Sequence, residues 1–376
     1  MKEKNGIIRS AFITGASFTG YNIGSGFATG MEATQFFVSW GARKAAVGLI
    51  IAFFTALSVL TAVYVCGFEK KFDDSKKVYR YFCGEKFGAV FDGYMYISMI
   101  LITLTLISGA GATVNQYCGI PVYAGSALMG AVCIATSLIG LKKLRSVLSY
   151  LCVPILVFIV ICGIYAASKT NIDLAEIPAD EYAANGLLIR SGIFGIENPW
   201  LSALSSAGLL INSGFAWASA TGALCTSRKE AAVSGILSSL LFYAASAVVV
   251  FLVLVSIDKA AGTEVPMLAV TEKFLPALTP FYSLIIVLAI FSTVSGRLFL
   301  IGERYGGGSK KRSFIIVTVI TVFSCIGASF IPFSRLSSFM FSVCGAAGII
   351  FGVIVFAKVI IERCKNKSES GGRNEA

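Results

Sequence analysis

The sequence predicts an all-α membrane protein that crosses the bilayer many times. Of its 376 residues, 56% are hydrophobic and only 14% are charged, a composition that is typical of polytopic membrane proteins and not of soluble domains. The apolar residues gather in long stretches, and the charged residues gather in the short segments between them. These two observations predict the fold class, and the uneven placement of the basic residues predicts the orientation.

Ten apolar stretches are long enough to cross a bilayer, which takes about 20 helical residues. The predicted spans are residues 8–37, 44–66, 89–112, 119–140, 146–168, 200–224, 231–256, 277–301, 313–332 and 336–361. Together they predict a single transmembrane domain over residues 1–362. The remaining residues, 363–376, are polar and are expected to form a disordered cytoplasmic tail.

Most of the 31 lysines and arginines lie at one set of span ends, the set that includes both chain termini. Basic loops are retained in the cytoplasm, so both termini are predicted to be cytoplasmic. The long loops at 168–199 and 257–275 are then on the outer side. We expect an interfacial helix near 187–196, and a segment in the second loop that is apolar enough to dip back toward the protein.

The sequence argues against several classes of function. It contains no histidine, so catalysis, metal binding and proton relays that depend on imidazole are excluded. Its ten cysteines form no CxxC pair and lie mostly in apolar spans, as small buried residues do. We therefore expect no enzyme activity and no organic cofactor. The net charge of +11 follows from the orientation rule, so the expected partners are the lipid bilayer and a small-molecule substrate, with no nucleic acid.

The first span is expected to be a broken helix. Residues 11–37 contain five glycines, and each costs a helix interior about 1 kcal/mol relative to alanine. Asn22–Gly26 is the weakest part, because two of its side chains also compete for backbone hydrogen bonds. A broken helix within the membrane offers a place to bind a solute or an ion. The alternative is a continuous helix whose glycines permit close packing.

A short repeat links the first and sixth spans. Five of six residues match between Ile23–Ala28 and Ile211–Ala216, and each segment lies in the first span of a group of five. This predicts a 5+5 inverted repeat, with repeat one at about 8–168 and repeat two at about 200–361. Helices 1 and 6 would both be discontinuous, the second of them near Asn212–Gly214. The alternative is a chance likeness between two small-residue packing faces.

The two breaks would form a substrate site among spans one, three, six and eight. The N-termini of the helix halves carry partial positive charge and would attract a substrate carboxylate, while aromatic side chains would supply apolar walls. For each aromatic residue, ordinary packing is the alternative. The candidate substrate-binding residues are Asn22, Gly24, Ser25, Gly26, Phe27, Asn212, Ser213, Gly214, Phe215 and Trp217.

The segment GYNIGSGFATGMEATQFF, residues 20–37, resembles the first span of the YkvI-like bacterial membrane proteins. These proteins resemble the ten-helix core of the amino acid–polyamine–organocation superfamily, which has the LeuT fold. The resemblance implies a multi-pass protein of the bacterial inner membrane. It would be a secondary active transporter of an amino acid or related zwitterion, coupled to sodium or protons through alternating access. The same fold also allows a ligand receptor that does not transport, as in germination permeases. Neither reading predicts an oligomeric state.

The pattern Gly20-x-x-Ile23-Gly24-x-Gly26 resembles the Gly-x-x-Val-Gly-x-Gly motif of sodium-coupled LeuT-like transporters. The resemblance implies that the carbonyls of Gly20 and Ile23 and the hydroxyls of Ser292 and Thr293 hold a sodium ion. Two departures stand against it: Phe27 replaces the asparagine of that motif, and Arg297 places a positive charge about one turn beyond the hydroxyls. The alternative is that both hydroxyls bond within their own helix.

Glu32 is a carboxylate well inside the first span, and an intramembrane ionisable residue indicates function by default. Three roles are open: a proton-coupling group, a ligand for a substrate amine, or half of an outer gate with Arg335. The alternative is a carboxylate that reaches the outer water by snorkelling.

Overall fold

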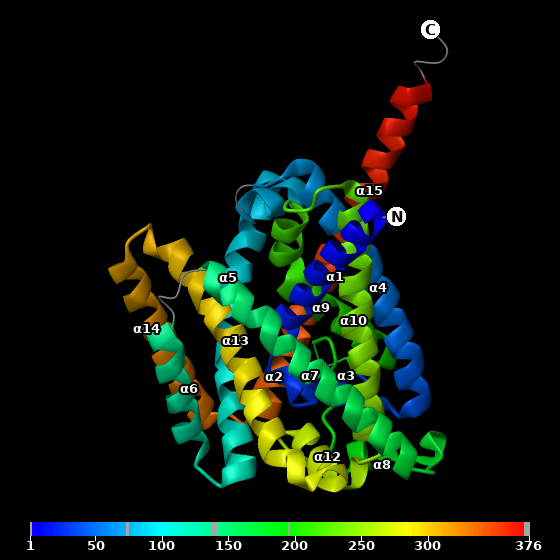
Figure 1. Cartoon of the computed structure of the whole chain (residues 1–376), viewed down its shortest axis with the longest axis vertical. Helices are drawn as coiled ribbons and strands as arrows, with labels where there is room; N and C mark the ends of the chain where they lie inside the picture. The colour runs from blue at the N-terminus through cyan, green and yellow to red at the C-terminus, as the bar shows by residue number, and fades with distance from the viewer. Residues whose placement is uncertain (1, 73–74, 137–140, 195, 372–376) are drawn as a thin grey trace.

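The computed structural model describes residues 2–72, 75–136, 141–194 and 196–371, and this part of the chain is almost entirely helical (Figure 1). An isolated bridge between Ile193 and Ile196 is its only β interaction among the described residues. The α-helices are α1 (Lys2–Asn22), α2 (Ser25–Ala28), α3 (Met31–Phe36), α4 (Ala42–Lys70), α5 (Ser75–Cys118), α6 (Val122–Thr136), α7 (Leu141–Lys169), α8 (Ala179–Ala184), α9 (Pro199–Gly222), α10 (Arg228–Leu254), α11 (Ile257–Ala260), α12 (Pro266–Phe274), α13 (Thr279–Gly306), α14 (Lys310–Phe330) and α15 (Phe333–Gly371).

Among the described residues, six helices are long and apolar enough to cross a membrane: α4, α5, α10, α13, α14 and α15. The last part of α7 meets the same test only together with the segment Leu174–Ala184, from which it is bent by 93°. Helix α6 is apolar but shorter, with 15 residues. A multi-pass membrane protein is therefore confirmed, whereas the exact number of ten spans remains a prediction.

Several contacts between helices recur as matching pairs. Each helix of one contact is replaced, in the matching contact, by the helix that lies five predicted spans away in the chain. Helix α1 packs against α10 as α4 packs against α9, and α1 packs against α7 as α9 packs against α15. The contact of α5 with α14 likewise has its counterpart between α6 and α13. This pairing agrees with the predicted repeat of five plus five helices.

The first span is interrupted, as predicted. Helix α1 ends at Asn22, and Gly24 is extended, with φ −103° and ψ −160°, before α2 begins. A second interruption, which the sequence did not predict, lies at Gly30 between α2 and α3, where φ is +81°. The first span therefore consists of three helical pieces.

The prediction that the sixth span is discontinuous is wrong, because α9 runs through residues 212–214 as one helix. Tertiary contacts explain why these residues do not break it. The Ser213 hydroxyl donates to the side-chain oxygen of Asn22 and to the carbonyl of Leu210. Gly214 faces the Phe18 ring, and a Cβ there would lie 2.4 Å from a ring carbon. Gly214 thus serves close packing, the alternative that the sequence left open.

The predicted interfacial helix at 187–196 is not present in the described residues of that range. A short helix, α8, lies earlier in the same loop, and residues 187–192 are non-helical. The loop at 257–275 does dip back, since α12 has buried residues from Pro266 to Thr271. In the predicted tail, α15 continues as a helix to Gly371, while 372–376 lie outside the described residues.

Both ends of the chain lie at one end of the helical bundle, and α8 and α12 lie at the other (Figure 1). We call these the termini side and the far side. Helix α1 therefore begins, and helix α15 ends, on the side where the basic loops gather. The placement of both termini on one side agrees with an even number of crossings.

The termini side is predicted to be cytoplasmic. In a cysteine-free background, a cysteine at Asn185, in the far-side loop, should react with a membrane-impermeant maleimide in intact cells. A cysteine at Gly308, between α13 and α14, should react only after the cells are opened. The reverse labelling pattern would contradict the predicted orientation.

Candidate functional site

The break in the first span leaves backbone carbonyls without helical partners, and other elements satisfy them. The Thr293 hydroxyl on α13 donates to the Ile23 carbonyl at 3.1 Å. The Tyr282 hydroxyl on the same helix donates to Ala28 at 2.8 Å, and the Met267 backbone N–H on α12 donates to Thr29 at 2.9 Å. These bonds satisfy the requirement that backbone within a membrane be paired, and they anchor the broken span to α12 and α13.

Two glycines permit this arrangement for different reasons. Gly30 has a positive φ that L-residues rarely adopt, and a Cβ there would lie 2.8 Å from the Met267 side chain. At Gly26, an added Cβ would lie 2.6 Å from the Glu32 carboxylate. Gly26 therefore allows the carboxylate of α3 to approach the backbone of α2.

A small cavity lies beside the break, with a volume of about 50 Å³. It is enclosed by the first span together with α5, α9, α13 and α15. Its lining consists of Asn22, Gly24, Ser25, Gly26, Glu32, Ile102, Thr105, Leu106, Leu209, Ser213, Arg297, Ser337, Met340 and Phe341.

Arg297 is the cation of this cavity, and it is 4% exposed. Its guanidinium has no hydrogen bond or ion pair with the described part of the chain, and its Nε is buried without a partner. The guanidinium lies over the Tyr21 ring, whose centroid is 5.6 Å from the guanidinium carbon. A cation–π contact replaces only a part of the lost hydration, and no carboxylate of the described residues lies within ion-pair distance of the guanidinium.

Glu32 is the acid of the same cavity. It lies in the first turn of α3, and no hydrogen bond from the described residues reaches its carboxylate. A second, very small cavity also touches Glu32, between α3 and the residues Ser206 and Ser246. Thus a carboxylate and a guanidinium face one central cavity, and neither is paired in the structure.

Five of the ten candidate substrate-binding residues line this cavity: Asn22, Gly24, Ser25, Gly26 and Ser213. All five lie at the break or directly opposite it on α9. Asn212 is buried beside them, but its side-chain Nδ2 has no partner among the described residues. Gly214 faces Phe18, as described above.

The three aromatic candidates pack against other aromatic rings and do not line the cavity. Phe27 contacts Phe242, and Trp217 stacks on Tyr21 with ring centroids 4.8 Å apart. Phe215 lies in an aromatic cluster on the termini side with Tyr79, Phe82 and Phe351. Tyr79 and Phe82 belong to the first turns of α5, before its kink at Gly84.

The candidate sodium ligands are only partly brought together. Thr293 contacts the Ile23 carbonyl, as described, and also bonds within its own helix to Ala289 at 3.1 Å. The Ser292 hydroxyl bonds to the same Ala289 carbonyl at 2.8 Å. The structure describes no contact between Gly20 and either hydroxyl. Ser292 therefore adopts the alternative of bonding within its helix, whereas Thr293 reaches the break.

The proposed pairing of Glu32 with Arg335 is not found. Arg335 is exposed and lines a different, far-side hollow together with Arg190, Glu197 and Phe339. Glu32 instead shares its cavity with Arg297. The cation opposite Glu32 thus comes from α13 and not from α15.

Sequence reasoning included span three, which is α5, but named none of its lining residues, and it missed the contribution of α15 to the lining. The residues are Ile102, Thr105 and Leu106 on α5, and Ser337, Met340 and Phe341 on α15. Such residues occur in every span of this chain, so no sequence signal distinguishes these six from lipid-facing or packing residues. Span ten was not included among the predicted site helices.

No protein-family model matches the sequence. The structure of MhsT in complex with L-phenylalanine has a TM-score of 0.66 to this structure, at 15% identity, covering 92% of this chain and 88% of that one. The chain has the LeuT fold. Inward-facing Mhp1 gives a TM-score of 0.58 at 13% identity, covering 93% and 76% of the two chains. A Na⁺-coupled sialic acid symporter also gives 0.58 at 13% identity, covering 94% and 79%.

In sequence, the chain is 24% identical over 354 residues to the uncharacterized protein YyaD of Bacillus subtilis (strain 168). The alignment covers 91% of this chain and 95% of YyaD. The two proteins are therefore similar over nearly their whole lengths. In this LeuT fold, the cavity lies at the interruption of the first span.

Proposed function

We propose that the protein is a secondary active transporter of a small zwitterion, an amino acid or a related compound, that works by alternating access. The observation that carries this proposal is that a carboxyl group and a guanidinium, those of Glu32 and Arg297, line one central cavity without a hydrogen bond or ion pair to the described residues. An isolated ion buried away from water is costly. A solute with one carboxylate and one ammonium group would offset the cost at both positions.

The substrate carboxylate would accept hydrogen bonds from Arg297, whose planar guanidinium suits a carboxylate. The ammonium group would donate to Glu32 and to acceptors at the break, where Ser25 and Ser213 also line the cavity. Because the cavity is only about 50 Å³, a solute much larger than a few water molecules would require its walls to move. We infer that substrates enter through conformations more open than this one.

The solved structures of similar fold support transport as the activity. MhsT was solved with an amino acid, and the sialic acid protein is a Na⁺-coupled symporter. By this proposal the chain lies in the bacterial inner membrane with both termini cytoplasmic. A receptor on the same fold would bind the ligand equally well but would not move it across the membrane.

A ligand screen tests the proposed substrate class. The purified protein in detergent should be stabilised against heat by one or more small amino acids or related zwitterions. It should not be stabilised by the matching amine or the matching carboxylic acid alone, because each satisfies only one of the two charges. Stabilisation by an uncharged solute of the same size, with none by zwitterions, would contradict the proposal.

Sodium coupling through Ser292 and Thr293 is a separate prediction. If the ion binds there, the double variant Ser292→Ala/Thr293→Ala should need much more sodium for ligand binding, since two neutral oxygen ligands are lost. If Arg297 serves in place of the ion, wild-type binding should be independent of sodium. A titration of ligand binding against sodium separates these cases. Sodium-independent binding in the wild type would reject the ion site.

A further inference from the structure

A second cavity, on the far side, differs in chemistry from the central one. It has a volume of about 110 Å³ and lies where four segments meet: α3, the loop at 186–189, the segment at 260–264 and the start of α15. Its lining consists of Met31, Thr34, Gln35, Gly186, Leu187, Leu188, Ile189, Ala260, Gly262, Thr263, Glu264 and Ser334. Neither Glu32 nor Arg297 belongs to it.

Gln35 contributes an oxygen without a partner. The residue is 0% exposed, and its Nε2 donates to the Ser334 carbonyl at 3.1 Å. A carbonyl can only accept, so this bond fixes the orientation of the amide. The other amide atom, Oε1, has no hydrogen-bond partner among the described residues. A buried acceptor without a donor is unfavourable, and here it belongs to a side chain that lines a cavity.

Glu264 supplies the negative charge. Its two carboxylate oxygens accept from the hydroxyl and the backbone N–H of Ser334, at 2.8 and 2.7 Å. Each oxygen keeps a free lone pair after these bonds. Gln35 and Glu264 are thus both held against Ser334, on the lining of one cavity.

The remaining polar side chains on the lining have already used their donors. The Thr34 hydroxyl donates to the Gly30 carbonyl at 2.8 Å, and the Thr263 hydroxyl donates to the Ala260 carbonyl at 2.8 Å. Their oxygens can still accept. None of the lining residues is basic. The side chains of this cavity therefore offer mainly acceptors and one negative charge, and the second N–H of the Gln35 amide is the one side-chain donor that these bonds leave.

We propose that this cavity binds a hard monovalent cation, a sodium ion, with Gln35 Oε1 and the Glu264 carboxylate as its ligands. Oxygen-only ligands favour hard cations, and a single carboxylate balances a single positive charge. The hydroxyl oxygens of Thr34 and Thr263 can complete the ligand shell. This site is separate from the candidate ion site at Ser292 and Thr293, and it does not depend on the proposed transport function.

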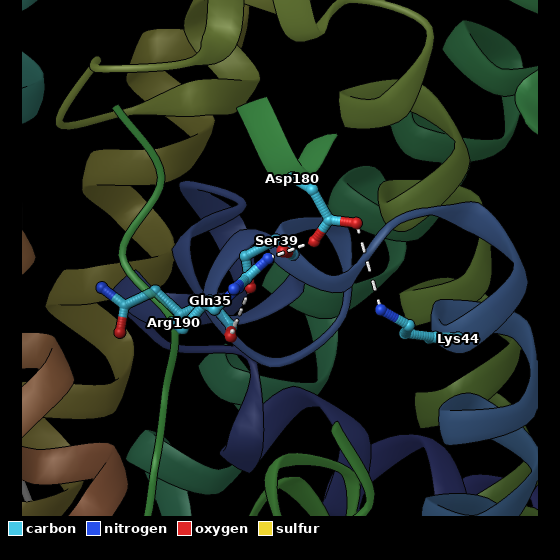
Figure 2. Close-up of polar contacts among 5 residues, drawn as sticks. All are labelled: Gln35, Ser39, Lys44, Asp180 and Arg190. Carbon is cyan, nitrogen blue, oxygen red and sulfur yellow. Dashed lines mark hydrogen bonds and ion pairs between the residues drawn. The ribbon is translucent and has the colours of Figure 1, made fainter. Parts of the chain in front are cut away.

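The surrounding contacts hold the cavity in shape. The backbone N–H of Ser191 donates to the Gln35 carbonyl at 3.0 Å. Arg190 donates from Nε to the Ser39 carbonyl at 3.1 Å and pairs with Asp180, which Lys44 also approaches (Figure 2). Figure 2 shows the Gln35 side chain pointing away from this charged group. The loop is therefore attached to the end of the first span without using the Gln35 amide, and a bound cation would further stabilise this attachment.

Sodium binding to the purified protein tests the proposal. Equilibrium binding of radioactive sodium is measured in the Ser292→Ala/Thr293→Ala variant. Because this variant lacks the other candidate ion site, sodium that it binds is assigned to the far-side cavity. This background should bind sodium and should be more heat-stable in sodium chloride than in choline chloride. Adding Glu264→Gln removes a charged ligand and should weaken sodium binding at least as much as the loss of an outer-shell partner does, which is about 10- to 100-fold. The matched control is Glu272→Gln, which removes an exposed charge from α12 and should leave binding unchanged.

Two results would overturn the proposal: no sodium binding in the double-alanine background, or equal binding with and without Glu264→Gln. If Glu264→Gln does not fold, Gln35→Met in the same background tests the same proposal, because it removes Oε1 and keeps the side-chain length. Sodium binding should be weakened in this variant too. Failure to find a transported substrate would leave this result unaffected. Loss of sodium binding would likewise leave the proposed substrate site intact.

Discussion

Replacing Arg297 with alanine is expected to abolish tight binding and transport of the substrate. Truncating one partner of a buried charge pair costs about 2–5 kcal/mol, which corresponds to a loss of affinity of about 30-fold or more. Arg297→Lys should recover part of the affinity, because lysine keeps the charge but lacks the planar pair of donors. The measurement is ligand binding to the purified variants by calorimetry.

Replacing Arg297 with an apolar residue of similar length should have an opposite effect on the ligand-free protein. Arg297 is buried and has no counter-ion in the described structure, so an apolar residue such as Arg297→Met should raise the melting temperature without ligand. Arg335→Ala is the control, because Arg335 is exposed and lies outside the central cavity. Wild-type affinity in Arg297→Ala would show that this guanidinium does not recognise the substrate.

Replacing Glu32 with glutamine is expected to eliminate accumulation of substrate against a gradient. The substitution keeps the shape of the side chain and removes its charge, so the ammonium group of the substrate loses its counter-ion. If Glu32 is instead a proton-coupling group, accumulation is lost but exchange and binding remain measurable. Uptake and exchange, measured together in liposomes, distinguish these two roles.

Two controls show whether the effect of Glu32→Gln is specific to this carboxylate and to its cavity. Glu197→Gln removes an exposed far-side carboxylate and should behave as wild type. A double-mutant cycle on ligand binding should show coupling between Glu32 and Arg297 on the order of 0.5–3 kcal/mol, and no coupling between Glu32 and Arg335. Wild-type uptake in Glu32→Gln would mean that this carboxylate is only solvated.

The interruption of the first span could be predicted because its cause is local. Two glycines and an asparagine fall within five residues, and no side chain nearby can restore the helix. Similar residues in α9 do not interrupt it, because their effects depend on tertiary contacts. Ser213 bonds to Asn22 of the first span, and Gly214 receives the ring of Phe18. A sequence pattern alone does not show which partner a small or polar residue will meet.

The two ionisable residues of the site could be recognised in the sequence, because burying an ionisable side chain in a membrane span is unfavourable in free energy. Glu32 and Arg297 are ionisable residues within apolar spans, and such residues rarely occur there without a function. Their placement on one cavity was not predictable: Arg335 was an equally reasonable partner for Glu32. The far-side cavity was not predictable at all, because Gln35, Glu264 and Ser334 are far apart in the chain and each is ordinary for its position.

Uptake into liposomes containing only this protein tests the central claim most directly. A zwitterion that stabilises the purified protein is supplied in labelled form, and a sodium or proton gradient is imposed across the liposome membrane. The account predicts that wild type accumulates the label above its external concentration while the gradient lasts, and that Arg297→Ala does not. Binding of the zwitterion by wild type with no uptake or exchange under either gradient would contradict transport and would indicate a receptor.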